Sequence, residues 1–305
     1  MSSDAPTEVE HLRLAAEIAG VRPAEVVAPG EHDVVLCGLR LHYLDWGRRG
    51  LRPIVFLHGG ALCSRSLDVV CLALRTRYHC IALDQRGHGD SEWSPTLEYG
   101  PEAHAGDVAA LLGHLGLRDA VLVGQSMGAL NAFTFTRLHP ESVAALVIVD
   151  AGPGVRAPGA SSIVNFVRDT AEVDSPETFV EQALAFQPRR DPRLLRWSSR
   201  HHLRRLASGK WVRKHDMRHF GGADAAGIAE RLRPYWNGAE SVTCPVLVVR
   251  GSESEVLLDE DAERFAWQMP KGRWVRVEDA GHNVQGDNPR ALVECLRAFL
   301  DDVGL

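Results

Sequence analysis

The stretch AVLVGQSMG, residues 120–128, decides the fold. Four apolar residues precede the pattern Gly124-Gln125-Ser126-Met127-Gly128, and a helical pattern follows over residues 126–139. A short apolar run of this kind is typical of a buried strand. The pattern G-x-S-x-G between a strand and a helix predicts a sharp turn with Ser126 at its tip. Glycines two positions to either side leave room where other side chains would clash.

This turn gives Ser126 the position of a nucleophile. It lifts the hydroxyl above the sheet, and the helix that follows points backbone N–H groups at developing negative charge. A second loop, His58-Gly59-Gly60, follows the expected strand Ile54–Leu57. We expect an oxyanion hole formed by the N–H groups of Gly60 and Met127, and a structural role for His58.

A serine needs a general base, and His282 is the candidate. It lies in Glu278-Asp279-Ala280-Gly281-His282-Asn283, after the last expected strand. The chain contains thirteen other histidines, so composition does not select it. Folds that present a serine on such a strand-to-helix turn have their catalytic residues in the chain order serine, acid, histidine. They therefore need a late histidine on a loop after a strand, and His282 meets that requirement.

Apolar runs and helical patterns alternate around these motifs, which predicts an α/β fold with a mostly parallel sheet flanked by helices. Residues 1–30 are expected to form an N-terminal helical extension, with a helix over 8–20, and the runs on either side of Cys37-Gly38 a hairpin. The core is expected at 31–151 and 238–305, and residues 152–237, which show no clear strand, as an inserted helical lid. Further strands are expected at Cys80–Leu83, Ala120–Val123, Val143–Val149, Val246–Val249 and Arg273–Val277, and helices at Pro101–Leu115, Ser126–His139, Asp259–Gln268 and Pro289–Leu300.

Taken together, HGG (58–60), DQRGHGDS (84–91), GQSMG (124–128) and AGH (280–282) resemble the α/β-hydrolase superfamily, in its esterase, lactonase and C–C hydrolase branch. The resemblance spans about residues 33–150 and 240–302. It implies the hydrolase fold and a Ser-His-acid triad, and it makes DQRGHGDS a structural turn. Dehalogenases and epoxide hydrolases of this fold use aspartate as the nucleophile, so Ser126 argues against both.

The acid of the triad departs from the family's usual pattern, in which G-x-x-D follows the penultimate strand. This chain has Gly251-Ser252-Glu253-Ser254-Glu255, with Ser254 in the aspartate position. Glu255, one residue further, is one candidate. Asp150 is the other, because some members resemble an arrangement with the acid about 24 residues after the nucleophile, and Asp150 follows Ser126 by 24. We prefer Asp150 and keep Glu255 as the alternative.

Composition excludes several functional classes. The chain has 305 residues, 45% hydrophobic and 24% charged, and its net charge of −6 argues against a nucleic-acid footprint. No apolar run approaches the ~20 residues that span a bilayer, and the acidic start does not resemble a secretory signal, so we expect a cytoplasmic protein without membrane contact. The six cysteines form no C-x-x-C pair. The histidine pair of His215-Asp216-Met217-Arg218-His219 lacks the glutamate of a metalloprotease helix, and we expect neither metal nor cofactor.

The expected lid is basic. The stretch from Arg189 to Arg218 contains eleven Arg or Lys residues and only two acidic residues, Asp191 and Asp216. A solvated cationic surface explains this pattern, and recognition of an anionic substrate by one inward-facing arginine is the alternative interpretation. Trp197, Trp211 and Trp236 are candidates for a substrate pocket under the lid, and packing is their alternative role.

These observations predict a hydrolase for a small ester, lactone or related carbonyl substrate, acting through an acyl-enzyme on Ser126. Two rival classes remain open. In a cofactor-free oxygenase or perhydrolase His282 is the base and Ser126 is secondary. In a ligand-binding protein built on the hydrolase scaffold neither residue turns over a substrate, and fold alone does not choose among the three.

Overall fold

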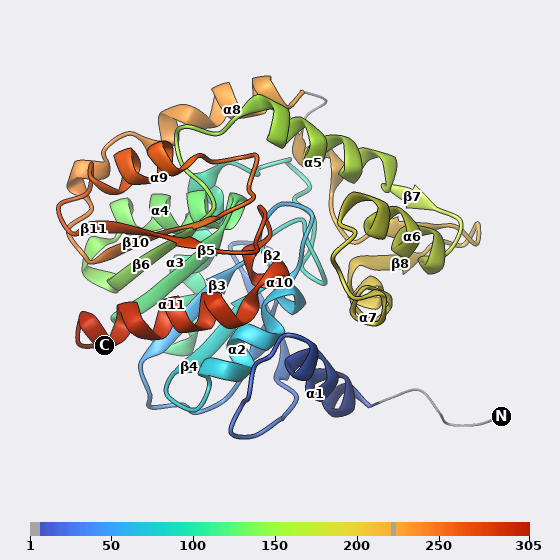
Figure 1. Ribbon diagram of the computed structural model, residues 1–305, viewed down its shortest axis with the longest axis horizontal. Coiled ribbons are helices and arrows are strands. Elements are labelled where there is room, and N and C mark those ends of the chain that lie inside the picture. The colour runs from blue at the N-terminus through green and yellow to red at the C-terminus, as the bar shows by residue number, and fades with distance from the viewer. Residues whose placement is uncertain (1–6, 221–223) are drawn as a thin grey trace.

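The computed structural model describes residues 7–220 and 224–305. Its centre is an eight-stranded sheet with the order β1-β2-β4-β3-β5-β6-β10-β11, shown between two layers of helices in Figure 1. The strands from β4 to β11 run parallel, and β1 and β2 are antiparallel at one edge. The predicted α/β architecture is therefore confirmed. The strands are β1 (Gly30–Leu36), β2 (Leu39–Asp45), β3 (Pro53–Leu57), β4 (His79–Leu83), β5 (Ala120–Gln125), β6 (Val143–Val149), β10 (Val246–Gly251) and β11 (Gly272–Val277).

The edge hairpin forms where the sequence predicted it. Cys37 and Gly38 both have positive φ, at 50° and 76°, and join β1 to β2 as a two-residue turn. Positive φ at both central positions gives a turn whose twist matches that of the flanking strands.

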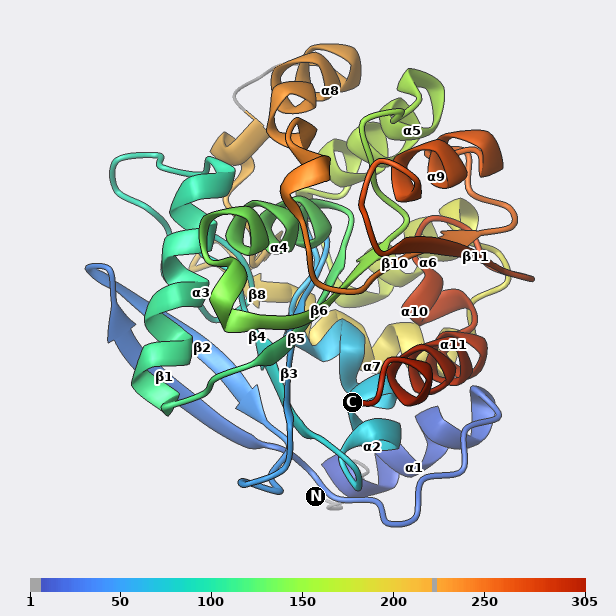
Figure 2. The same cartoon turned by 90° about the vertical axis from the view of Figure 1, so that its left-hand side faces the viewer.

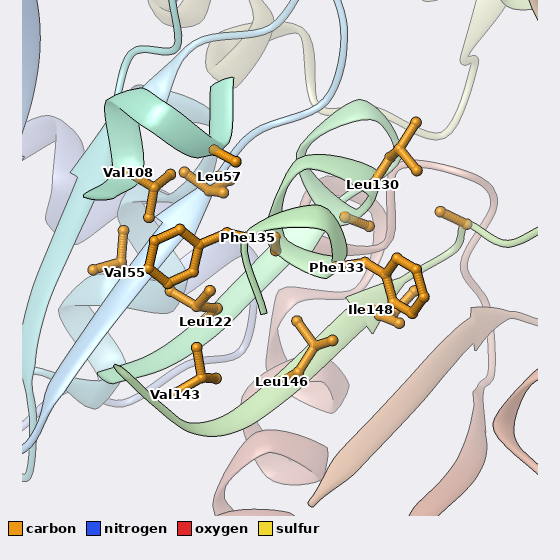
Figure 3. Close-up of a cluster of buried hydrophobic side chains, with 14 of the residues drawn as sticks. Val55, Leu57, Val108, Leu122, Leu130, Phe133, Phe135, Val143, Leu146 and Ile148 are labelled. Carbon is orange, nitrogen blue, oxygen red and sulfur yellow. The ribbon is translucent and has the colours of Figure 1, made fainter. Parts of the chain in front are cut away.

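The central strands are apolar on both faces because helices cover both. On one face β-strand residues such as Val55, Leu122 and Ile148 pack against α3 (Pro101–Leu115), α4 (Met127–Leu138) and α9 (Asp259–Ala266). Figure 3 shows part of this cluster around Phe133 and Phe135 of α4. On the other face the alternate residues pack against α2 (Asp68–Leu74) and α11 (Pro289–Asp302). Figure 2 shows the sheet between these layers from the side. The position of α2 had no prediction from the sequence.

The N-terminal segment packs against the core. Helix α1 (Glu8–Ile18) begins at a capping box. The Thr7 side chain accepts a hydrogen bond from the Glu10 N–H, and the Glu10 carboxylate accepts one from the Thr7 N–H. Leu12 and Ala16 are buried in the same cluster as α2 and α11. The predicted helix over residues 8–20 is confirmed.

The segment between β6 and β10 is mostly helical, as predicted, but it also contains strands, and the expectation of no strand was wrong. β7 (Glu172–Val173), β9 (Trp211–Arg213) and β8 (Leu203–Arg205) form a small antiparallel sheet in that order. Runs of two or three residues are too short to show a period of two in the sequence. Its helices are α5 (Ala157–Asp169), α6 (Pro176–Phe186), α7 (Pro192–His202) and α8 (Ala225–Leu232), which lie beside and above the sheet in Figure 1. We call this segment, residues 152–237, the insertion.

Candidate active site

Ser126 stands on a strained turn between β5 and α4. Its φ of 53° and ψ of −116° lie in a region that residues other than glycine rarely adopt. The Ser126 N–H donates to the Val149 carbonyl of β6 at 3.0 Å, which ties the turn to the neighbouring strand. The sheet therefore holds the serine in a conformation that the isolated chain would avoid.

The two flanking glycines are required by close backbone contacts. A Cβ on Gly124 would lie 2.3 Å from the Gly128 carbonyl oxygen, because α4 turns back directly over β5. A Cβ on Gly128 would lie 2.2 Å from the Leu57 carbonyl oxygen, because α4 packs against the end of β3. Any larger residue would push the helix away from the sheet and move Ser126 with it.

His282 lies on the loop between β11 and the short helix α10 (Val284–Asp287). Its Nε2 is 3.0 Å from the Ser126 Oγ and its Nδ1 is 2.7 Å from the Asp150 Oδ2. A carboxylate only accepts, so Nδ1 carries the ring proton and Nε2 is free to accept from the serine hydroxyl. The three side chains form one chain of hydrogen bonds.

Asp150 is the carboxylate that the structure brings to His282. It follows β6 directly, is fully buried, and has a positive φ of 50°. Its Oδ1 accepts from the Gly251 N–H at 3.1 Å, and its Oδ2 also accepts from the Ser254 hydroxyl at 2.5 Å. Ser254, which occupies the position of the family's usual acid, therefore donates a hydrogen bond to Asp150, the preferred candidate. The Glu255 side chain is exposed, and its backbone carbonyl faces Gly159 of α5.

The loop His58-Gly59-Gly60 lies against the same turn. A Cβ on Gly59 would meet the Gln125 Oε1 at 2.0 Å, so only glycine allows this contact. Met127 is the first residue of α4, where backbone N–H groups have no partner within the helix. The structure thus brings the loop that carries Gly60 next to the helix end that carries Met127.

The His58 side chain has the structural role that the sequence indicated. Its Nδ1 donates to the Gly59 carbonyl at 2.8 Å, and its Nε2 accepts from the Gln85 N–H at 3.1 Å. The Gln85 side chain donates to the His58 carbonyl at 2.6 Å and accepts from Asn131 at 2.7 Å. Burial lowers the pKa of His58, so the ring stays neutral. Gln85 and Asn131 were missed because amides carry no motif of their own.

Gln125 was also missed, although it is the variable residue next to Ser126. Its Nε2 donates to the His282 carbonyl at 3.1 Å while its Oε1 lies against Gly59. One amide therefore connects the loop of residues 58–60 with the loop of His282. The only sequence signal for it is its place beside the serine, which puts it at the carboxyl edge of β5.

The segment DQRGHGDS folds as the structural turn that the resemblance implied. The Asp84 carboxylate accepts from the backbone N–H groups of Ser64 and Asp90, at 2.6 and 2.9 Å, and lies 2.9 Å from the His42 Nδ1. Among the described residues, His42, Asp84 and Asp90 are also close enough to hold a cation. Their oxygens already serve these backbone groups and the Lys214 ammonium, so we assign them to the turn.

The three tryptophans proposed for a substrate pocket have different locations. Trp236 belongs to the core, 6% exposed, with its ring against Phe133 and Phe265, which agrees with the alternative role in packing. The sequence places Trp236 at the end of the insertion, but it does not show that this end packs onto α4 and α9. Trp211 packs against a small cluster inside the insertion.

Trp197 lies at the edge of a cleft of about 570 Å³ between α1, α7 and the His282 loop. Its ring stacks on His11 of α1 at 3.9 Å between centroids. The cleft also includes Gly281 and Gln285, on either side of His282 in the chain. Trp197 therefore borders a cleft that reaches the loop of His282.

Seven of the eleven basic side chains between Arg189 and Arg218 have acidic partners. These ion pairs include Arg190–Asp287, Arg193–Asp191, Arg196–Glu177, Lys210–Asp174, Lys214–Asp90 and Arg218–Asp216. Arg213 differs from them. It is 4% exposed, and within the described residues it has hydrogen bonds to Thr170 and Ala61 but no carboxylate. Arg213 is therefore the arginine that best fits recognition of an anionic substrate.

With the geometry established, comparison with known proteins places the chain. A family model described as the alpha/beta hydrolase fold matches residues 52–289, and the chain belongs to the α/β-hydrolase family. It is 31% identical to Esterase Rv0045c of Mycobacterium tuberculosis, with 99% of each chain covered. The crystal structure of that esterase matches with a TM-score of 0.76 at 30% identity, covering 98% of this chain and 100% of the other.

A second relative is the 2-(acetamidomethylene)succinate hydrolase of Mesorhizobium japonicum, 28% identical over 85% of this chain and 91% of its own. The chain is accordingly an enzyme of the family's esterase branch, an ester-acting hydrolase of small molecules. In the described part of the chain, every helix is too short or too polar to cross a membrane.

Beside the site lies a group of buried and half-buried histidines whose pKa values are lowered. They belong to α3, to α7 and to the segment that follows β9. Burial is the main cause for all of them, and neighbouring cations and imidazoles add to it. The pKa is about 3 for His201 and His215, about 4 for His202 and His219, and well below 6.5 for His104.

These histidines should make the protein less stable as the pH falls below about 6.5, whereas Asp68, whose pKa burial raises to about 7, acts in the opposite sense. In the unfolded chain they bind protons below about pH 6.5, whereas in the native state they stay neutral down to about pH 4. The free energy of unfolding should therefore fall as pH drops from 6.5 to 4, by up to about 1.4 kcal/mol per pH unit for each histidine. His42 also acts in the opposite sense: burial lowers its pKa, but the hydrogen bond to Asp84 and the nearby carboxylate charges together outweigh burial and raise it. Chemical denaturation across this pH range measures the slope.

Two histidines of α3 provide the matched comparison. His104 is 2% exposed and packs towards His219, whereas His114 is exposed at the end of the same helix. His104→Gln should reduce the pH slope of stability, and His114→Gln should leave it unchanged. Equal slopes in the wild type and His104→Gln would contradict the assignment.

Proposed function

We propose that the chain hydrolyses small esters or lactones through an acyl-enzyme on Ser126. The observation that carries this proposal is the continuous path of hydrogen bonds from the Ser126 Oγ through His282 to Asp150, at 3.0 and 2.7 Å. In the proposed first step Ser126 attacks the substrate carbonyl while the His282 Nε2 takes its proton. Asp150 holds the ring in the required tautomer and stabilises the imidazolium that forms.

The remaining groups follow the charge that develops on the substrate. The N–H groups of Gly60 and Met127 would hold the oxyanion, and the strained turn keeps Met127 in place before the substrate arrives. His282 then gives its proton to the leaving alcohol. A water molecule, activated by the same ring, attacks the acyl-enzyme and releases the acid. No metal or cofactor is needed for these steps.

The same geometry favours hydrolysis over the two rival functions. In an oxygenase that uses His282 as a base on its substrate, the serine need not be hydrogen-bonded to the imidazole. In a binding protein the strained φ of Ser126 has no purpose. The 3.0 Å contact between Ser126 and His282 and the strained turn together support a role for Ser126 as a nucleophile.

Covalent labelling tests the proposal directly. A fluorophosphonate probe should label the wild type, and Ser126→Ala should abolish both labelling and the hydrolysis of p-nitrophenyl esters, because the nucleophile is gone. Ser208→Ala, on an exposed turn of the insertion, is the matched control and should retain both. Labelling that persists in folded Ser126→Ala, or a wild type that neither reacts nor hydrolyses any ester of a broad panel, would refute the proposal.

We also infer that the substrate carries a carboxylate and that Arg213 recognises it. The guanidinium lies over the rings of both Phe166 and Phe179, about 5 Å from each centroid, and its Nη1 donates to the Ala61 carbonyl at 3.3 Å. Ala61 follows Gly60, so the cation lies beside the loop of the proposed oxyanion hole. Burial lowers the pKa of Arg213 to about 10, which leaves it charged at neutral pH.

A buried cation without a counter-charge is costly, and a substrate carboxylate would supply that charge. The name of the Mesorhizobium relative describes a substituted succinate as its substrate, which supports the same chemistry. The preference should appear only with the insertion in place, because Arg213 belongs to its strand β9.

Matched esters test the role of Arg213. For p-nitrophenyl acetate and mono-p-nitrophenyl succinate, Arg213→Met should lower the succinate-to-acetate ratio of kcat/KM by about tenfold or more, since charged hydrogen bonds contribute roughly 1.5–3 kcal/mol. Arg213→Lys should keep part of the preference, and Arg205→Met, on the exposed neighbouring strand, should keep all of it. A ratio that Arg213→Met leaves unchanged would return Arg213 to a packing role.

A further inference from the structure

The insertion reaches the loop of His282 through a largely buried ion pair. Arg190, between α6 and α7, donates from Nε to the Asp287 Oδ1 at 2.8 Å. Asp287 is the last residue of α10, the short helix that follows His282. Both side chains are about four-fifths buried, at 18% and 19% exposed, so solvent screens this pair less than an ordinary surface pair.

Asp287 passes this contact on to the backbone beside the catalytic ring. Its other oxygen, Oδ2, accepts from the Gly281 N–H at 3.0 Å. Gly281 directly precedes His282 in the chain. One carboxylate therefore connects a cation of the insertion with the peptide that carries the imidazole.

The guanidinium of Arg190 lies directly on α10. A Cβ on Gly286 would lie 2.3 Å from the Arg190 Nη1, so the side chain passes close over this glycine. The preceding residue, Arg189, offers a contrast. It forms an ion pair with Glu253, but these side chains are 67% and 39% exposed, so this pair lies at the surface.

We propose that Arg190 is a positioning residue for His282 and acts through Asp287. This inference rests on the proposed function, in which His282 is the base. With the insertion seated, Arg190 fixes the Asp287 carboxylate, the carboxylate fixes the Gly281 N–H, and the imidazole stays aligned between Ser126 and Asp150. Displacement of the insertion removes the cation and frees the loop, so seating the insertion and orienting the base are one event.

The expected size of the effect follows from geometry. A displacement of about 1 Å in a catalytic group can cost roughly 100-fold in rate. Because Arg190 does not contact the reacting atoms, its loss should lower kcat and leave KM almost unchanged. Arg190→Met should therefore reduce kcat about 10- to 100-fold, Arg190→Lys should restore part of it, and the control Arg189→Met should stay within about twofold of the wild type.

The pH profile separates positioning from simple loss of structure. Arg190→Met leaves the Asp287 anion without its partner near His282, which favours the imidazolium, so the acidic limb of the kcat profile should move to higher pH. Asp287→Asn leaves the Arg190 cation without its partner, so the limb should move to lower pH. In the double variant the limb should return towards the wild-type position. The other charges around the loop, Asp150, Asp279 and the Arg189–Glu253 pair, are the same in these three proteins.

The experiment measures kcat, KM and the pH dependence of fluorophosphonate labelling for the wild type and these variants, with circular dichroism as the check on folding. Shifts in opposite directions, with partial rescue by Arg190→Lys, support the inference. A loss of activity with an unmoved pH profile and no rescue, or full activity in Arg190→Met, overturns it. If Arg190→Met does not fold, the same criteria apply to Arg190→Lys and Asp287→Asn. A wild type that shows no labelling and no hydrolysis would instead refute the proposed function.

Discussion

The buried carboxylate of Asp150 is the group on which the rest of the site depends. It accepts hydrogen bonds from the Gly251 N–H, the Ser254 hydroxyl and the His282 ring. The segment of Asp150, the segment of residues 251–254 and the loop of His282 are far apart in the chain, and they meet at this one charge. A buried carboxylate is tolerated only when it is well hydrogen-bonded, and these three donors meet that requirement. The ends of β6 and β10 and the loop after β11 are thereby held in one arrangement around Ser126.

A steric constraint acts together with this charge. The backbones of β3, β5 and α4 approach so closely that Gly124 and Gly128 cannot carry a Cβ, and Ser126 is held at a positive φ. Packing of apolar residues on both faces of the sheet provides the stability that this strain consumes. The hydroxyl is therefore presented by the core of the protein, whereas the base lies on a loop whose position also depends on Asp287 and Arg190.

Much of this could be predicted from the sequence because it follows from local patterns. The apolar runs located the parallel strands, and G-x-S-x-G in its strand-to-helix context located the turn of Ser126. The choice of acid stayed open, since no local pattern tells whether Asp150 or Glu255 reaches the imidazole. Ser254 was noted only as a missing aspartate, and its bond to Asp150 requires the paired register of β6 and β10.

The insertion was the least predictable part, for physical reasons that differ between its features. Its strands of two and three residues are too short for a periodic signal, and Trp236 sits at a boundary where lid and core have the same composition. Its basic residues looked like one cationic surface. Their partners, such as Asp287 for Arg190 and Asp90 for Lys214, are distant in the sequence, so only the folded chain distinguishes the paired cations from Arg213.

The central claim is that Asp150 holds His282 in its working tautomer. Proton NMR of the far-downfield imidazole signal, measured with kcat, tests it most directly. Asp150→Asn should remove the Nδ1 proton signal of His282 and lower kcat by several orders of magnitude, as the matching change in serine proteases does by about 10⁴. Glu255→Gln should preserve both the signal and kcat. A signal that survives in folded Asp150→Asn and disappears in Glu255→Gln would contradict the account.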